Sequence, residues 1–222
     1  MKSNSSKRRK LPPAASTAYE RHITEAGYET VAGVDEAGCG ALAGPVVAAA
    51  VIMRPDVRIP HVTDSKLLTS ADRERLCEQI QSKCAAWAAA LSPPDLIDTM
   101  NIYHARLRAM RLAVEALSLA PQFVVIDGHV TPRLAIPCEA VVGGDRKCRI
   151  VAAASIVAKV VRDALMIEMD DVYPAYGFRR HKGYGTRQHL QAIAEHGPCP
   201  IHRRSFAPIV AYLQESLDFE DQ

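Results

Sequence analysis

The amino-acid sequence predicts an α/β fold in which a mixed central β-sheet is flanked by helices and followed by a helical C-terminal extension. Strand-like segments crowd the first part of the chain, where the run 44–53 is apolar enough to be buried on both faces. Farther on, segments with helical spacing of apolar residues alternate with short apolar runs. Strands first and alternating helices and strands afterwards are typical of a mixed sheet covered by helices.

The first half of the chain supplies three strands and one helix. Residues 30–34 and 44–53 are expected to form the first two strands, joined by a glycine-rich turn. Thr69 belongs to the residue types that cap helix N-termini, which predicts a helix over 69–83. The small-residue run 85–91 favours a strand over a second helix.

The second half alternates helices with short strands. Two short apolar runs lead into loops that each carry an aspartate, Asp127 in the first and Asp145 in the second. The segments around them have apolar residues at three- and four-residue spacing, which indicates amphipathic helices. The expected elements are a helix at 101–117, strands at 123–126 and 139–142, a long helix at 149–169, and helices at 186–195 and after 205.

Length and composition predict one folded domain over residues 18–222. The chain has 222 residues, of which 48% are hydrophobic and 23% charged, as in globular proteins with a substantial core. Residues 1–17 combine Ser, Pro, Lys and Arg with almost no large apolar side chain, which predicts a flexible basic tail. The net charge of +2 permits a nucleic-acid partner only if basic residues gather on one face.

The cysteines and the apolar segments indicate a cytoplasmic protein. The six cysteines include no C-x-x-C pair, so we expect reduced thiols instead of a zinc site or a disulfide framework. No apolar stretch has the length of a membrane span, and the basic N-terminus does not resemble a secretion signal. We expect a monomer without a readable protein partner, because the tail 214–222 lacks an aromatic-ended clamp-binding motif.

Adjacent carboxylates at the end of a predicted strand are the strongest functional signal. Asp35 and Glu36 follow a hydrophobic run, and two such charges about 4 Å apart repel by roughly 4 kcal/mol at an effective dielectric of 20. Protonation or a divalent cation must neutralise them, and oxygen ligands without a Cys or His cluster favour Mg²⁺ or Mn²⁺. Asp127 and Asp145 are candidates to complete the site, which suits phosphodiester hydrolysis with two metals. Structural acids or a single calcium-like site remain the alternatives.

A glycine-rich segment follows these acids. The sequence from Gly38 to Ala43 reads GCGALA and formally matches the G-x-G-x-x-A pattern of a dinucleotide-binding turn. That pattern must open a helix, whereas the residues after it are rich in Val and form a predicted strand. We therefore expect a tight loop whose exposed backbone approaches a sugar or a phosphate closely.

Several blocks together resemble the ribonuclease HII family, the type 2 ribonucleases H. They are VAGVDEAGCGALAGPVVAAAVI, DSKLL, NIYHARLRAMRLAVEAL, VVIDG, VVGGD, AAASIVAKVVRD, YGFRRHKGYGT and GPCPIHRRSFAP, and they span about residues 19–210. The resemblance implies a ribonuclease H-like fold and two divalent ions, Mn²⁺ or Mg²⁺. The residues that it assigns to these ions, for catalysis and metal binding, are Asp35, Glu36, Asp127 and Asp145. It makes Asp163 a salt-bridged neighbour.

The resemblance also implies the substrate. Such enzymes act on RNA–DNA hybrids and cut on the 5′ side of a ribonucleotide in duplex DNA, leaving a 3′-hydroxyl and a 5′-phosphate. The 2′-hydroxyl distinguishes RNA from DNA, and the family reads it with the glycine loop and a tyrosine. In this chain the nucleic-acid-binding residues so implied are Gly38, Cys39, Gly40 and Tyr184, with Lys66, Ser155, Lys159, Arg203 and Arg204 as phosphate contacts.

One position departs from the family pattern. Cys39 stands where the glycine loop normally carries arginine, so one cation near the phosphate is missing. An alternative function is therefore a hybrid-binding module with impaired cleavage. A further alternative is another nuclease on the same fold, such as a junction resolvase, which would cut branched DNA.

Overall fold

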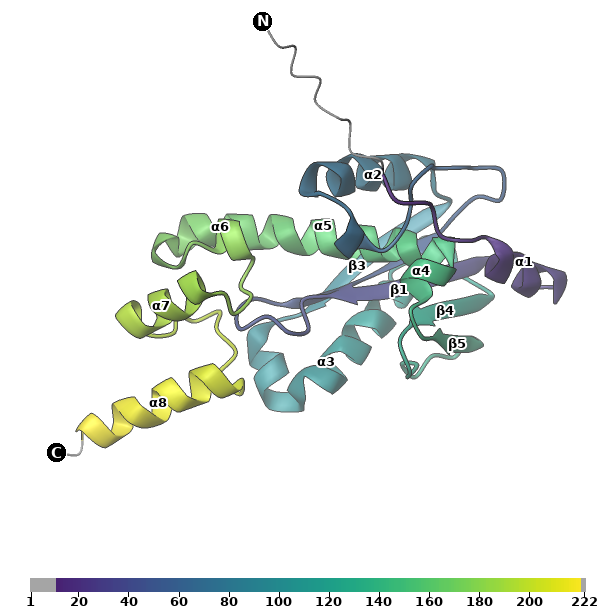
Figure 1. Ribbon diagram of the computed structural model, residues 1–222. Coiled ribbons are helices and arrows are strands. Elements are labelled where there is room, and N and C mark those ends of the chain that lie inside the picture. Colours follow the sequence, from purple (N-terminus) through teal and green to yellow (C-terminus); the bar gives the residue numbers. More distant parts are fainter. Residues whose placement is uncertain (1–10, 221–222) are drawn as a thin grey trace, which may run out of the picture.

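The structure, a computed structural model, describes the backbone of residues 11–220 and contains a mixed five-stranded sheet (Figure 1). The strand order is β3-β2-β1-β4-β5. β1 pairs antiparallel with β2 and parallel with β4, so the predicted mixed sheet is confirmed. The strands are β1 (Val31–Ala37), β2 (Val46–Ile52), β3 (Ala86–Ser92), β4 (Phe123–Asp127) and β5 (Cys138–Val141).

Helices cover both faces of this sheet. α5 (Arg149–Val172) lies on one face and α3 (Pro94–Glu115) on the other, as Figure 1 shows. β2 lies between them with all seven residues buried, which explains why its sequence is apolar throughout instead of alternating. α2 (Ser70–Lys83) packs on α5, and the Thr69 hydroxyl accepts a hydrogen bond from the Asp72 N–H, as expected of an N-cap.

α3 differs from its prediction at the N-terminal end. The sequence predicted a helix from residue 101, whereas the element begins at Pro94. Asn101 has a φ of 65°, and its side-chain oxygen accepts a hydrogen bond from the His104 N–H. Asn101, where the helix was predicted to begin, is therefore the N-cap of the second of two helices that together make up α3 and meet at a kink. The preceding helix was missed, although Pro94 is favourable in a first helical turn.

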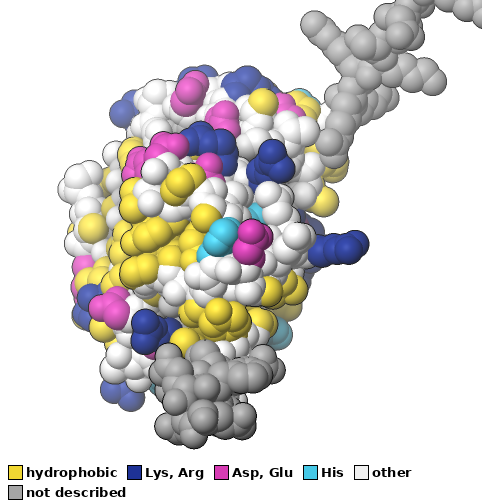
Figure 2. All heavy atoms as spheres, turned by 90° about the vertical axis from the view of Figure 1, so that its left-hand side faces the viewer, with side chains coloured by type: hydrophobic (Ala, Val, Ile, Leu, Met, Phe, Trp, Pro, Cys, Tyr) yellow, Lys and Arg dark blue, Asp and Glu magenta, His cyan; other side chains and the backbone are white. Residues whose placement is uncertain are grey.

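The C-terminal part forms a small helical unit against the far end of α5. It has its own apolar cluster around Phe178, Met166 and Ile209, each fully buried. Figure 2 views this end of the molecule, where hydrophobic side chains gather and charged ones of both signs surround them. The predicted helical extension is confirmed. Its elements are η2 (Pro174–Tyr176), α6 (Phe178–His181), α7 (Arg187–His196) and α8 (Ala207–Glu220).

The stretch before the first helix lies within the predicted tail. The Ala15 N–H donates to the Val62 carbonyl at 2.8 Å, and the Ser16 carbonyl accepts from the Arg149 N–H at 3.0 Å. The chain then enters α1 (Ala18–Glu25). Within the predicted tail 1–17, residues 15 and 16 are therefore bonded to the folded domain through their backbone. The basic run 7–10 lies outside the described residues.

Three further expectations concern membrane-spanning helices, the state of the cysteines and the C-terminal segment. Within the described residues, no helix combines the length and the apolar composition needed to cross a membrane. All six cysteines are free thiols. The C-terminal segment 214–222, in which no clamp-binding motif was found, lies almost wholly outside the residues whose side chains the structure describes.

Candidate active site

Three of the predicted acids converge at one edge of the sheet. Asp35 on β1 and Asp127 at the end of β4 are neighbours because these parallel strands end at the same edge. Asp145 joins them from α4 (Gly144–Lys147), and one carboxylate oxygen from each lies within 4.8 Å of the others. The Gly144 N–H donates to Asp127 Oδ1 at 2.7 Å, which holds the α4 turn against β4.

The electrostatics of this cluster favour a cation. Burial, followed by the charges of Glu36 and Asp127, raises the pKa of Asp35 well above its usual value, although the Ser155 hydroxyl and the Glu36 N–H lower it. Burial also raises the pKa of Asp145, with Asp64 and Asp127 adding to the effect. Repelling carboxylates with raised pKa values are a donor set that fits Mg²⁺ or Mn²⁺, which prefer oxygen ligands.

Glu36 lies apart from the three aspartates. Successive strand residues point to opposite faces, so Asp35 faces α5 while Glu36 faces α3. Glu36 Oε1 accepts from Cys39 Sγ at 3.4 Å and from Arg106 Nη1 at 3.5 Å. Its Oε2 is buried and has no hydrogen-bond partner among the described residues. The sequence predicted that four acids would converge, and the structure brings three together and leaves the fourth with an unpaired oxygen.

Asp64 is an acid that sequence reasoning missed. It is only 6% exposed, and its Oδ2 lies 3.8 Å from Arg146 Nε. It immediately precedes the Ser-Lys pair from which only Lys66 was selected. Partial burial lowers the pKa of Lys66, but Asp64, Asp145, Asp35 and Asp127 together raise it above its usual value. The exposed Lys66 side chain therefore sits in the field of the acidic cluster.

Ser155 has a different role from the predicted phosphate contact. It is 4% exposed, and its Oγ lies 3.0 Å from Ser65 Oγ. It also hydrogen-bonds to Asp35. The prediction from the polar stripe of α5 is therefore corrected, because the first turns of this helix are packed against the sheet. Ser155 contacts the acidic cluster from the interior of the protein and does not face solvent.

The glycine loop is supported by buried arginines. Gly38 has a φ of 97°, and a Cβ there would lie 1.9 Å from Arg162 Nε. Gly40 is exposed, and a Cβ there would meet no described atom within 4 Å. Gly38 is thus required by the fold, whereas Gly40 leaves open space on the outer side of the loop. Cys39 is half-buried, and burial together with Glu36 raises its pKa to about 12.

Arg203 is buried, whereas the sequence predicted a side chain exposed to phosphate. It is 0% exposed and donates to the carbonyls of Gly38, Cys39 and Gly44 at 2.7–3.0 Å. A guanidinium carries five N–H donors, which suits it to hold several carbonyls of one tight turn. Burial lowers the pKa of Arg203 to about 10. The prediction is wrong because the residue braces the loop from inside.

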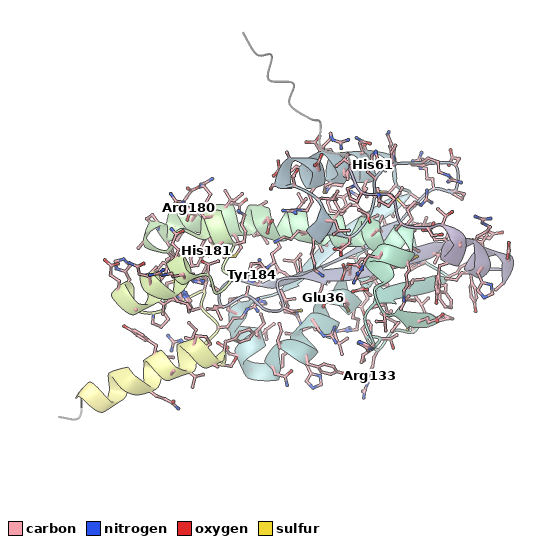
Figure 3. All side chains as sticks on the ribbon, in the orientation of Figure 1. Glu36, His61, Arg133, Arg180, His181 and Tyr184 are labelled. Atoms are coloured by element: carbon pink, nitrogen blue, oxygen red, sulfur yellow. The ribbon has the colours of Figure 1, made fainter. Side chains whose placement is uncertain are left out.

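Tyr184 lies beside the loop, at an isolated bridge with Ala41. Two cations lie near its ring, Lys159 Nζ at 5.1 Å and Arg162 Cζ at 5.2 Å from the centroid. Lys159 also donates to Asp163 Oδ1 at 2.7 Å, which confirms the expected ion-paired role of Asp163. In the view of Figure 3, Tyr184 and Glu36 lie near each other at the centre of the molecule.

Arg204 remains exposed at the edge of the C-terminal unit. Its backbone N–H donates to Asp98 Oδ2 at 2.9 Å, which ties the segment to α3. Of the predicted phosphate contacts, the structure therefore leaves Lys66, Lys159 and Arg204 with accessible side chains and buries Ser155 and Arg203.

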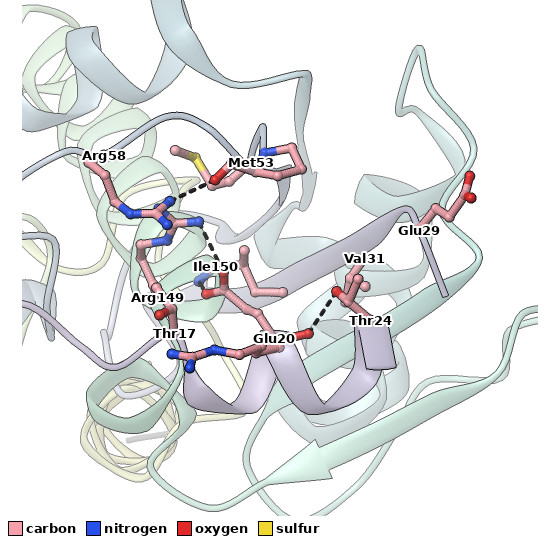
Figure 4. Close-up of a pocket in the computed structure, with 11 residues that line it drawn as sticks. Thr17, Glu20, Thr24, Glu29, Val31, Met53, Arg58, Arg149 and Ile150 are labelled. Carbon is pink, nitrogen blue, oxygen red and sulfur yellow. Dashed lines mark hydrogen bonds and ion pairs between the residues drawn. The ribbon is translucent and has the colours of Figure 1, made fainter. Parts of the chain in front are cut away.

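A second charged cluster lies toward the opposite end of β1. A pocket of about 220 Å³ is lined there by Glu20, Arg58, Val31 and Arg149 among others (Figure 4). Glu20 Oε2 accepts from Arg149 Nη2 at 3.1 Å, and Glu20 Oε1 accepts from the Ile150 N–H at 2.8 Å. This carboxylate holds α1 on the first turn of α5, and both of its oxygens have partners.

Comparison with known proteins agrees with this geometry. The family described as Ribonuclease HII matches residues 32–209. Proteins named Ribonuclease HII from Idiomarina loihiensis and Dichelobacter nodosus are 50% and 52% identical over 81% and 84% of this chain and 96% and 98% of their own. The crystal structure of the ribonuclease H2 from Pyrococcus horikoshii superposes with a TM-score of 0.69 at 27% identity, covering 84% of this chain and 98% of that one.

Proposed function

The chain belongs to the ribonuclease HII family, and we propose that it cuts on the 5′ side of ribonucleotides embedded in duplex DNA as well as within RNA–DNA hybrids. Membership makes it a ribonuclease H, an endonuclease that acts on RNA paired with DNA. The proposal adds the position of the cut and its products, a 3′-hydroxyl and a 5′-phosphate. The convergence of Asp35, Asp127 and Asp145 beside the glycine loop, in which Gly40 is exposed, is the observation that carries it.

The three aspartates are proposed as the metal ligands. Their oxygens lie within reach of a shared ion, and Glu36 Oε2, buried without a partner, is available as a further donor. Divalent ions bound there would activate a water and stabilise the departing 3′-oxygen. Ser155 holds the Asp35 carboxylate in place, and its hydrogen bond to the charged form offsets part of the increase in the pKa of Asp35 that burial causes.

The glycine loop and Tyr184 are proposed to recognise the ribose. Gly40 offers backbone without a side chain, and the space beside it admits the close approach of a sugar. Tyr184 can pack its ring against the neighbouring nucleotide. Arg162 and Arg203 hold the carbonyls of the loop on its inner side, so the loop is preorganised before substrate binds.

Cleavage of defined substrates tests the proposal. The substrates are a DNA duplex with one ribonucleotide, a long RNA–DNA hybrid and an all-DNA four-way junction, each with Mn²⁺, with Mg²⁺ and with chelator. We expect metal-dependent cutting of the first two and a 5′-phosphate on the ribonucleotide. Cutting of the hybrid alone would remove the embedded-ribonucleotide activity. Cutting of the junction would favour a resolvase, and binding without cutting would favour the impaired module.

A further inference from the structure

A basic groove borders the candidate active site on the α3 side of the sheet. It has a volume of about 600 Å³, and its walls are one face of α3 and residues 130–133 of the loop that follows β4. The basic and aromatic side chains that line it are Tyr103, His104, Arg108, Arg111 and Arg133. Its lining, all of it in the described part of the chain, includes neither Asp nor Glu.

Most of this positive charge is not neutralised within the groove. Arg111 pairs with Glu115 at 2.9 Å, but Arg108 contacts only the neutral Leu91 carbonyl and Ser92 hydroxyl, both at 3.4 Å. Arg133 is exposed. Within the described residues, no ion pair holds either Arg108 or Arg133. The groove therefore offers at least two cations to an anionic ligand.

Aromatic surface accompanies the charge. The Tyr103 side chain is exposed, and its ring lies edge-on to the His104 ring with centroids 5.0 Å apart. Cations interleaved with exposed rings are typical of surfaces that bind polynucleotides. A protein-binding surface would instead have an apolar centre with few charges.

The groove lies close to Glu36, the neighbour of Asp35 in the sequence. Its outer wall begins at Val130, three residues after Asp127. On the α3 side, Arg106 Cζ lies 5.4 Å from the ring centroid of the lining residue Tyr103, and Arg106 pairs with Glu36. In the view of Figure 3, Glu36 lies between Tyr184 and Arg133. Tyr184 and Arg133 of the groove thus lie on different sides of Glu36 in this view.

We propose that this groove holds the phosphate backbone of one strand of the substrate duplex, beyond the linkage that is cut. The assignment rests on the proposed function, because a duplex cut at the acidic cluster must leave the site on both sides. The glycine loop and Tyr184 contact the substrate on the side of the ribose. Arg108 and Arg133 then take phosphates on the other side, which positions the duplex without reading its bases.

Steady-state cleavage by the full-length enzyme with Mn²⁺ tests this assignment. The change is Arg133→Glu, and the substrates are a long duplex with one ribonucleotide and versions shortened stepwise on either side of it. On the long duplex we expect KM to rise several-fold with kcat unchanged, because the lost contact stabilises the bound substrate and the transition state equally. The slope of log affinity against log salt, measured by anisotropy, should fall by about one unit. Once one side is too short to reach the groove, wild type and variant should become equal.

Two control variants isolate the effect. Arg133→Lys keeps the charge and should retain the wild-type KM, whereas Arg54→Glu makes the same charge reversal on the exposed arginine after β2, toward the other end of the sheet, and should change nothing. Equal KM values and salt slopes for Arg133→Glu and wild type on every length would overturn the groove assignment. Failure of the wild type to cut the ribonucleotide would overturn the proposed function instead, and the anisotropy series would still judge the groove.

Discussion

The carboxylates toward the two ends of β1 meet opposite surroundings. Glu20 has a partner for each oxygen, with Arg149 Nη2 at 3.1 Å and the Ile150 N–H at 2.8 Å. Asp35, Asp127 and Asp145 instead face one another, and the nearest basic ion-pair partner of Asp145 is the exposed Arg146 at 3.9 Å. A satisfied carboxylate stabilises the fold, whereas repelling carboxylates are retained where a ligand will neutralise them.

The largest expected effect breaks the unsatisfied cluster. Asp127→Asn removes a charged ligand while preserving the acceptor for the Gly144 N–H. Metal-based charge stabilisation is worth several kcal/mol, so kcat should fall by about a thousandfold or more. Single-turnover cleavage measures the loss, and anisotropy should report hybrid affinity within a few-fold of wild type. Turnover preserved at saturating Mn²⁺ would remove Asp127 from the metal site.

Breaking the satisfied cluster should affect stability instead. Glu20→Ala leaves Arg149, whose side chain is 7% exposed, without its counter-charge. Loss of one partner of a buried pair should lower the free energy of unfolding by about 3 kcal/mol. Urea denaturation measures this change, and kcat of the folded variant should equal that of wild type. If Glu20→Ala were fully folded but less active, the conclusion that Glu20 contributes only to stability would be contradicted.

The pH dependence of stability should sharpen the contrast. The folded metal-free protein holds a proton on Asp35 more tightly than the unfolded chain does, because the pKa of Asp35 is raised. Its contribution therefore favours folding at low pH and is lost as pH rises from the usual carboxyl value through the raised pKa. Excess Mn²⁺ should abolish this loss by neutralising the cluster.

A difference measurement separates this effect from the buried histidines. The pKa values of His189 and His202 are lowered to about 4 by burial first of all, so their contribution is lost as pH falls from about 6.5 toward 4. Only the acidic cluster should respond to Mn²⁺. Thermal melting of wild type and Asp145→Asn, with and without the ion, gives the difference. Without metal, the free energy of unfolding of Asp145→Asn should exceed that of wild type by about 1 kcal/mol, because a charge that repels its neighbours is removed.

The smallest expected effect comes from adding a cation at position 39, next to Glu36. Cys39→Arg should bind the hybrid a few-fold more tightly and steepen the salt dependence by about one unit of log-log slope, since each neutralised phosphate contributes about 0.9. Binding measured over a range of salt concentrations checks it. An unchanged slope would mean that the new guanidinium touches no phosphate and pairs with Glu36, as Arg106 already does.

The sequence by itself determined the sheet, its principal helices and the acids that line its edge. Apolar runs such as β2 and the Thr69 cap are local signals. The ribonuclease HII motifs selected Asp35, Glu36, Asp127 and Asp145 as a set, of which the three aspartates converge. Short segments escaped prediction, α1 and α4 among them, because their few residues carry too little periodicity.

Only the tertiary structure decided which polar side chains face the substrate. Ser155, Lys159 and Arg203 looked alike as polar residues near the motifs, yet Ser155 and Arg203 are buried and Lys159 is not. Glu36 and Asp35 are adjacent in the chain, but the strand turns them to opposite faces. The burial and direction of a side chain depend on contacts between segments distant in sequence, which local patterns do not encode. Only the folded chain therefore shows which polar side chains can bind a ligand and which support the structure.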